Sequence, residues 1–247
     1  QYTVVLCSEI FMKILFTPIT SSSIAHVVRS FAVAERFIER GDEVFFTSCT
    51  LREDFIKHSN YQVVEHYSCF NLNDPEDQSL NYLEEHKKEM VEWFKAEIDA
   101  AKSVKPDVVI GSPRFLGPHV YYATGIPVVA LMNGQYLPTS KGLMGISYST
   151  DSLYLKAMRT ILKPVFERKF LDEYLSHVLD AYRQLGLPDK FSSQAEIYEP
   201  MALLIPGDEE CEPQSYLRHD SEFVGPMFWD GFERDEGGWS DKEIEAF

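Results

Sequence analysis

The sequence lacks the cysteine patterns of metal sites and disulfide frameworks. Its four cysteines, Cys7, Cys49, Cys69 and Cys211, form no Cys-x-x-Cys pair and no Cys/His cluster with zinc spacing. We therefore expect no metal site, and reduced thiols rather than disulfides. The first residues also lack the basic start and the apolar length of a signal peptide. Together these absences predict a cytoplasmic protein.

Positive charge and long apolar runs are scarce as well. The chain has 23 Lys and Arg against 39 Asp and Glu, a formal net charge of −16. This balance argues against nucleic acid or an anionic membrane surface as the main partner. No apolar run approaches the roughly 20 residues that cross a bilayer, so no transmembrane segment is expected. At 247 residues and 45% hydrophobic, the chain has the composition of a globular protein with a sizeable core.

What the sequence does contain is a βαβ unit in residues 12–48. A short apolar run is followed by a polar loop, an amphipathic segment and a second apolar run. The amphipathic segment places an apolar residue at every third or fourth position and ends at Gly41, a typical helix C′ glycine. We expect its inner stripe to be Val27, Phe31, Ala34 and Ile38.

The loop of this unit is a candidate ligand site, but it lacks the glycines that bind a phosphate group. It contains no glycine, so a Gly-x-Gly-x-x-Gly dinucleotide fingerprint is absent. It ends near His26, where the connection from the first strand enters the helix. Open α/β sheets bind their ligands outside the carboxyl ends of their strands. His26 is therefore the first candidate for a functional side chain.

Further elements follow the same alternation and predict an α/β fold, a Rossmann-like parallel sheet with helices on both faces. The expected helices are residues 51–58, 80–104, 119–124 and a pair within 152–185 that meets near Pro164. The expected further strands are residues 61–65, 108–111, 128–131, 201–205 and 222–224. A Gly-, Ser- and Tyr-rich loop is expected over residues 132–149, where long loops are usually functional.

The βαβ unit resembles the opening of the GT-B glycosyltransferases that attach sugars from nucleotide-sugars to natural products, lipids or xenobiotics. His26 and the pair Arg40-Gly41 stand at that family's relative spacing. Asp42 replaces the usual second histidine, which is a mild departure from the pattern.

Two later blocks resemble the same family in order and spacing. Residues 105–113 and 123–130 are similar to its block of a Pro-Asp strand, a helix and a Gly-Ile-Pro strand. Residues 223–226, Phe-Val-Gly-Pro, resemble the strand that leads out of the acceptor-binding domain. The resemblance runs from Met12 to about Trp229 and implies one half of a two-domain GT-B fold.

The resemblance also implies a domain layout. Residues 1–11 are an upstream extension or a leftover of cloning, and residues 12–226 form the Rossmann-like acceptor-binding domain. Residues 227–247 are the interdomain linker and the start of a donor-binding domain, which is expected in cis or on a separate chain. The implied co-substrate is a UDP- or dTDP-sugar, with no other cofactor.

Inverting sugar transfer needs a base for the acceptor hydroxyl, and a histidine suits that task near neutral pH. His26 is expected to be this base; the alternative is a capping or packing histidine. The family's supporting aspartate matches Ser112, which can accept a hydrogen bond but cannot neutralise an imidazolium. Ser112 is either a direct partner of His26 or a plain strand-end residue. Asp107 precedes its strand and should lie at the opposite edge.

Acceptor contacts should come from loops at the edge where His26 lies. The apolar and amide side chains there predict a hydrophobic small-molecule acceptor, such as a polyketide, macrolide, flavonoid or sterol. They equally fit a core beneath the loop. The candidates are Phe115, Leu116, Met132, Asn133, Gln135, Tyr136, Met144 and Tyr148.

Three functions remain open at this point. The first is the acceptor-binding half of an inverting, metal-independent glycosyltransferase, with the antibiotic or natural-product chemistry of the resembled family. The second is a non-catalytic GT-B-like binding module, or a subunit that needs a separate donor-binding chain. The third is another GT-B enzyme, such as a nucleotide-sugar epimerase, against which the apolar loops and the acceptor-type order of motifs argue.

Overall fold

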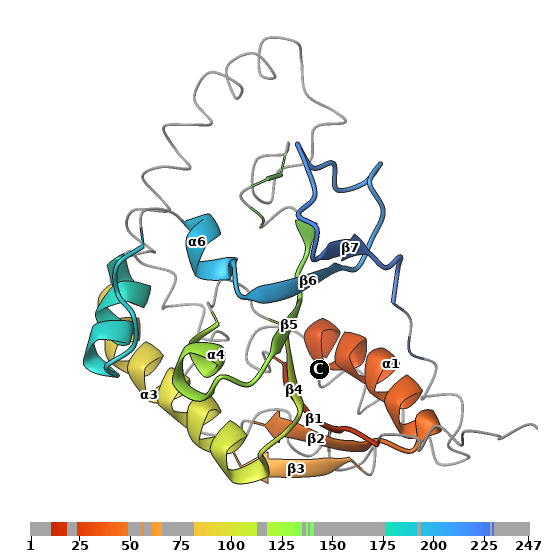
Figure 1. Ribbon diagram of the computed structural model, residues 1–247, viewed down its shortest axis with the longest axis horizontal. Coiled ribbons are helices and arrows are strands. Elements are labelled where there is room, and N and C mark those ends of the chain that lie inside the picture. Colours follow the sequence, from red (N-terminus) through yellow and green to blue (C-terminus); the bar gives the residue numbers. More distant parts are fainter. Residues whose placement is uncertain are drawn as a thin grey trace, which may run out of the picture.

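The computed structural model describes residues 11–18, 24–48, 56, 61–65, 82–112, 118–134, 137, 139–140, 176–191, 194–227 and 229. Within these ranges a seven-stranded sheet has the order β3-β2-β1-β4-β5-β6-β7, and every neighbouring pair is parallel (Figure 1). The strands are β1 (Lys13–Pro18), β2 (Glu43–Ser48), β3 (Gln62–Glu65), β4 (Val108–Ser112), β5 (Val128–Leu131), β6 (Met201–Ile205) and β7 (Ser221–Phe223).

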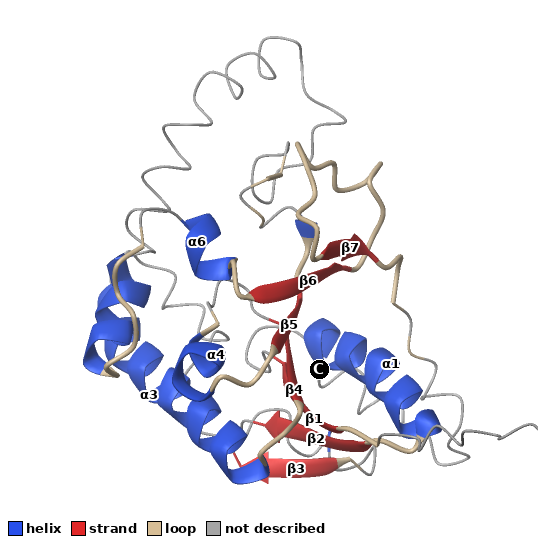
Figure 2. Cartoon of the chain, in the orientation of Figure 1, coloured by secondary structure: helices blue, strands red, loops and turns tan. Residues whose placement is uncertain are grey.

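Helices cover both faces of this sheet, as Figure 2 shows. One face carries α1 and the other carries α3 and α4. The helices are α1 (Ile24–Arg40), α3 (Tyr82–Val104), α4 (His119–Thr124) and α6 (Gln194–Tyr198), and residues 176–184 are helical as well. The predicted Rossmann-like α/β class is therefore confirmed.

The two faces follow from the alternation of side chains along each strand. In β1, Ile14 and Phe16 are fully buried beneath α1, where they join Val27 and Phe31 of that helix. Leu15, between them in the sequence, is fully buried in the cluster on the opposite face. Strands covered on both sides in this way have almost continuous apolar sequences, which is why they could be predicted.

Helix α1 ends as its sequence indicates, with one exception in its buried stripe. Gly41 has φ +94°, and its N–H donates to the Ile38 carbonyl while the Asp42 N–H donates to the Phe37 carbonyl, which is the Schellman pattern. Val27, Phe31 and Ala34 are fully buried as expected, but Ile38 is 47% exposed. In this last turn Phe37 takes the inner position instead: it packs against the same cluster and meets the Phe16 ring edge-on, with centroids 6.4 Å apart.

A third apolar cluster joins α3 to the helical residues 176–184. It contains Phe94 and Tyr182, both fully buried. Beside it, His119 at the start of α4 lies 2.6 Å from the Glu97 carboxylate, and its ring stacks on Phe94 with centroids 4.2 Å apart. This buried pair ties α4 to α3 behind the sheet.

Most sequence-predicted elements are confirmed. The predicted strand 222–224 is shifted by one residue, and α6, only five residues long, was not expected. The expected helix 51–58 lies outside the described residues except for Ile56, which is helical and fully buried. The helix pair in 152–185 is described only from residue 176 onward.

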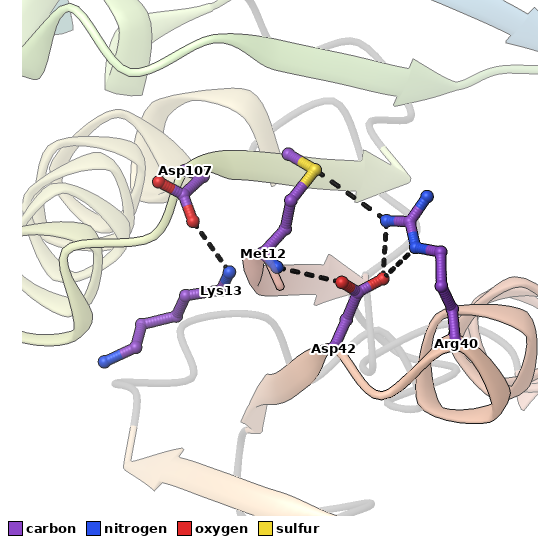
Figure 3. Close-up of polar contacts among 5 residues, drawn as sticks. All are labelled: Met12, Lys13, Arg40, Asp42 and Asp107. Atoms are coloured by element: carbon purple, nitrogen blue, oxygen red, sulfur yellow. Dashed lines mark hydrogen bonds and ion pairs between the residues drawn. The ribbon is translucent and has the colours of Figure 1, made fainter. Parts of the chain in front are cut away.

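Two aspartates hold the amino edge of the sheet (Figure 3). The Asp42 side chain is fully buried; it accepts hydrogen bonds from the Met12 N–H at 2.8 Å and from Arg40 Nε at 2.7 Å. Asp107 accepts from the Lys13 N–H at 2.8 Å. Asp107 therefore lies at the edge opposite to His26, as the sequence predicted. Asp42, at the position of the family's usual second histidine, has a structural role here.

Candidate functional site

The strand order predicts a ligand crevice outside the carboxyl ends of β1 and β4. The chain leaves the carboxyl end of β1 through α1 on one face to reach β2, and it leaves that of β4 through α4 on the other face to reach β5. Connections that diverge in this way open a crevice outside the carboxyl ends of the two strands. At this edge β1 ends with Pro18 and β4 ends with Ser112.

His26 lies at this edge, in the first turn of α1. It is the third residue of the helix, and its side chain is partly exposed while the next residue, Val27, is fully buried in the core. Its carbonyl accepts a hydrogen bond from Ser30 Oγ at 2.8 Å, one turn later. The burial of Val27 against the core fixes the rotation of the helix and leaves the neighbouring His26 partly exposed.

Asn133 follows β5 at the same edge and is bound to α1. Its Oδ1 accepts a hydrogen bond from Nη1 of Arg29 at 2.8 Å, across 104 positions of sequence. Arg29 lies three residues after His26, so the two side chains are neighbours along the helix surface. Burial lowers the pKa of the Arg29 guanidinium, and the negative charge of Glu212 partly offsets that shift.

The turn after β5 is also held from the opposite side by the segment that follows β6. The Gly134 N–H donates to Glu212 Oε2, and Gln214 Nε2 donates to the Gly134 carbonyl at 3.0 Å. Thr139 Oγ1 donates to Gln214 Oε1 at 2.7 Å, which extends the network. A Cβ atom at position 134 would lie only 2.6 Å from Gln214 Nε2, so a side chain there would have to displace the Gln214 amide.

The sequence-predicted site residues divide into three groups. His26 and Asn133 lie at the expected edge. Met132 is 1% exposed and packs in the core cluster beneath α3 and α4, and Ser112 ends β4, although its side chain is outside what the structure describes. Six candidates fall outside the described residues: Phe115, Leu116, Gln135, Tyr136, Met144 and Tyr148.

Arg29, Glu212 and Gln214 were not found from the sequence. Each binds a residue at least 78 positions away, so no local spacing links them. The one available signal was Gly134, three residues after a buried strand, because a glycine there often marks close backbone contact.

We searched the described ranges for metal sites, membrane-spanning helices and further hollows. No group of three or more His, Cys, Asp or Glu is placed to hold a metal ion there. None of the described helices is both long and apolar enough to span a membrane. An open hollow of about 370 Å³ lies between β3 and α3, away from the crevice, and its lining includes Glu92, Lys95 and Asp99. Since Lys95 and Asp99 pair with each other at 2.7 Å, that lining is a solvated ion-pair surface.

Glycosyltransferases are among the solved structures with the same arrangement. The calicheamicin glycosyltransferase CalG4 has a TM-score of 0.57 and 16% identity, covering 87% of this chain and 53% of its own. A kitacinnamycin glycosyltransferase has a TM-score of 0.58 and 14% identity; the match covers 93% of this chain and 55% of that structure. Os79 from O. sativa matches with a TM-score of 0.51 and 12% identity, over 94% of this chain and 56% of that structure. This chain has the fold of half a GT-B glycosyltransferase.

The chain spans about half of the length of each of these three solved structures. No family model matches the chain. No curated protein matches its sequence. At 12–16% identity, the likeness concerns the fold, and the roles of individual residues depend on the geometry above.

Proposed function

We propose that the chain is the acceptor-binding half of an inverting, metal-independent glycosyltransferase. The observation that carries this proposal is the position of His26, partly exposed in the first turn of α1, the helix that follows β1 at the carboxyl edge of the sheet. The GT-B fold of the chain supports sugar transfer as the general chemistry. The spacing of the cysteines supports a cytoplasmic location.

In this proposal His26 is the general base. Its imidazole takes the proton from an acceptor hydroxyl while the hydroxyl oxygen attacks the anomeric carbon of a UDP- or dTDP-sugar. The bond from that carbon to the nucleotide diphosphate breaks, and the diphosphate leaves with the electron pair. Attack from the face opposite the leaving group inverts the anomeric centre, and the imidazolium then releases its proton to solvent.

Ser112 is proposed to stand next to this base. The β4 register pairs Ser112 with Pro18, the last residue of β1, so the backbone brings position 112 to the edge where His26 lies. A serine hydroxyl can fix the orientation of the imidazole by a hydrogen bond, but it adds no negative charge. We therefore expect a weaker base than an aspartate-supported histidine would be.

The acceptor is proposed to be a hydrophobic, oxygen-containing small molecule. Asn133 supplies a polar anchor at the same edge. Solved structures with this fold include a calicheamicin glycosyltransferase, and Os79 was crystallised with a trichothecene. The remaining apolar candidates of the two loops would complete the pocket, which fits the usual composition of small-molecule sites.

A second candidate function is a binding module without catalysis, or a subunit completed by a separate donor-binding chain. Ser112 favours this candidate, since it stands at the position of the family's carboxylate. An acceptor would then bind at the same edge, but His26 would not transfer a proton.

Turnover distinguishes these candidates. UDP- and dTDP-sugars are offered with aromatic and polyketide acceptors, to the chain alone and with its cognate donor-binding domain in cis or in trans. We expect transfer only when that domain is present. Acceptor binding without transfer in either condition would support the binding module, and Ser112→Asp is then the variant that should restore activity.

A further inference from the structure

The hydrogen bond between Arg29 and Asn133 fixes which way the Asn133 amide faces. An asparagine side chain has an oxygen that accepts and an NH₂ group that donates, and its two orientations have nearly the same shape. A guanidinium has only donors. The atom that faces Nη1 of Arg29 must therefore be Oδ1, which it meets at 2.8 Å. The NH₂ group of Asn133 consequently faces away from Arg29.

The backbone that carries this amide is also held in place. Glu212 accepts from the Gly134 N–H, and Gln214 donates to the Gly134 carbonyl at 3.0 Å. A Cβ atom at Gly134 would press on the side chains of Gln214 and Glu212. The turn after β5 is thus clamped between α1 and the segment after β6. Supporting contacts of this kind fix the orientation of a binding side chain, because they remove its alternatives.

We propose that Asn133 selects the acceptor by donating from its NH₂ group to an oxygen of that molecule, and that Arg29 is the positioning residue that imposes this direction. The inference rests on the proposed acceptor-binding function and adds a chemical requirement to it. The acceptor must carry an oxygen that can only accept, a carbonyl or ether oxygen, besides the hydroxyl that reacts.

The spacing of the strands narrows the acceptor class. Asn133 follows β5, and α1 with His26 follows β1, with only β4 between these strands. Neighbouring strands lie about 4.8 Å apart, so the ends of β1 and β5 are separated by roughly 10 Å along the edge, and we expect the acceptor to reach across that length. A molecule of two or more fused rings, or a macrocycle, spans that length. A simple alcohol does not.

Asn133→Asp distinguishes a role of Asn133 in binding the acceptor from its structural contact with Arg29. The introduced carboxylate keeps an oxygen for Arg29 and adds an opposite charge, so the contact with α1 is retained. The NH₂ donor, however, is replaced by a second acceptor oxygen that repels the oxygen of a ligand. Binding of quercetin, an anthracyclinone and a macrolide aglycone is measured by calorimetry, together with thermal unfolding. We expect an unchanged or higher Tm and a Kd at least about tenfold weaker for each probe that the parent chain binds.

Arg29→Met tests the positioning role, with Arg36→Met as its matched control on the same helix. Arg36 pairs with Glu39 at the surface, where its side chain is 80% exposed. Removing Arg29 lets the Asn133 amide turn, and we expect weaker binding of the same probes. Arg36→Met should leave the affinity unchanged.

The outcomes separate the inference from the proposed function. If the parent chain binds none of the three probes, acceptor binding itself is contradicted. If it binds a probe and Asn133→Asp binds that probe equally well, the amide is only structural and the selection role is overturned. Equal affinity in Arg29→Met and the parent chain overturns the positioning role of Arg29.

Discussion

Trp229 donates its indole N–H to the carboxylate of Glu35, with 2.8 Å between Nε1 and Oε1. The indole ring also meets Phe31 edge-on, with ring centroids 5.0 Å apart. Glu35 and Phe31 lie one turn apart on α1, whose first turn carries His26. The segment after β7 is therefore tied to the helix that carries the proposed base.

We expect this tie to contribute measurably to the free energy of unfolding. Trp229→Phe removes the indole N–H and should cost about 1 kcal/mol, the usual worth of one such hydrogen bond. Trp229→Ala also removes the contact with Phe31 and should cost more. Urea unfolding checks both, with Tyr216→Ala, a 61% exposed aromatic position, as the control. A Trp229→Ala chain as stable as the parent would show that the contact contributes nothing.

Asp42→Asn is expected to destabilise the amino edge of the sheet. The carboxylate is fully buried and serves both the Met12 N–H and Arg40. An amide would turn an NH₂ group toward one of these donors, leaving a buried donor unsatisfied at a cost of about 1–3 kcal/mol. Glu43→Gln, at the next position along the chain and paired with Lys13 at the surface, should change stability by less than about 0.5 kcal/mol. Equal effects of the two substitutions would contradict this account.

Tyr182→Phe is expected to be neutral or stabilising, especially in alkali. The hydroxyl is buried and has no hydrogen-bond partner among the described residues. Burial raises the pKa of Tyr182 well above its ordinary value, so the phenol stays protonated in the folded chain at a pH where it ionises in the unfolded chain. The folded state thus loses stability as the pH rises above about 10, and the loss should be smaller in Tyr182→Phe.

Thermal unfolding of the two chains near neutral pH and in mild alkali, at a pH of about 10.5, measures this difference. Near neutral pH the gap in Tm should be small. A parent chain that gains stability relative to Tyr182→Phe in alkali has the opposite sign and would contradict the assignment of Tyr182 as a buried, neutral phenol.

His26→Ala is expected to lower turnover of the complete enzyme by about 100-fold or more, the low end of general-base contributions. Acceptor affinity should change little, because the base acts mainly on the transition state. His219→Ala, a histidine in the segment between β6 and β7, is the matched control and should keep normal turnover. Near-normal turnover in His26→Ala would remove His26 from the mechanism.

The fold could be predicted from the sequence because its strands are short apolar runs in a sheet covered on both faces. The predicted bounds of α4 and β6 agree with the structure to the residue. Helix α6 was missed because five residues are too few to show a period. Ile38 was misplaced because a period of 3.6 residues allows a step of three or of four, and the structure takes the step of three from Ala34 to Phe37.

The candidate site could be predicted only in part. His26 was found because it occupies a loop-to-helix junction after the first strand, a position with a topological meaning. Met132 was proposed as a contact, yet it packs in the core, because the alternation of β5 continues one residue beyond the strand. The network of Arg29, Glu212 and Gln214 joins distant segments and has no local pattern.

The most direct test of the central claim is calorimetric titration of the chain alone with a UDP-sugar, a dTDP-sugar and the three acceptor probes. An acceptor-binding half should bind at least one acceptor probe and show no measurable affinity for either nucleotide-sugar. Tight binding of a nucleotide-sugar without binding of any acceptor would contradict the account, because the chain would then be the donor-binding half.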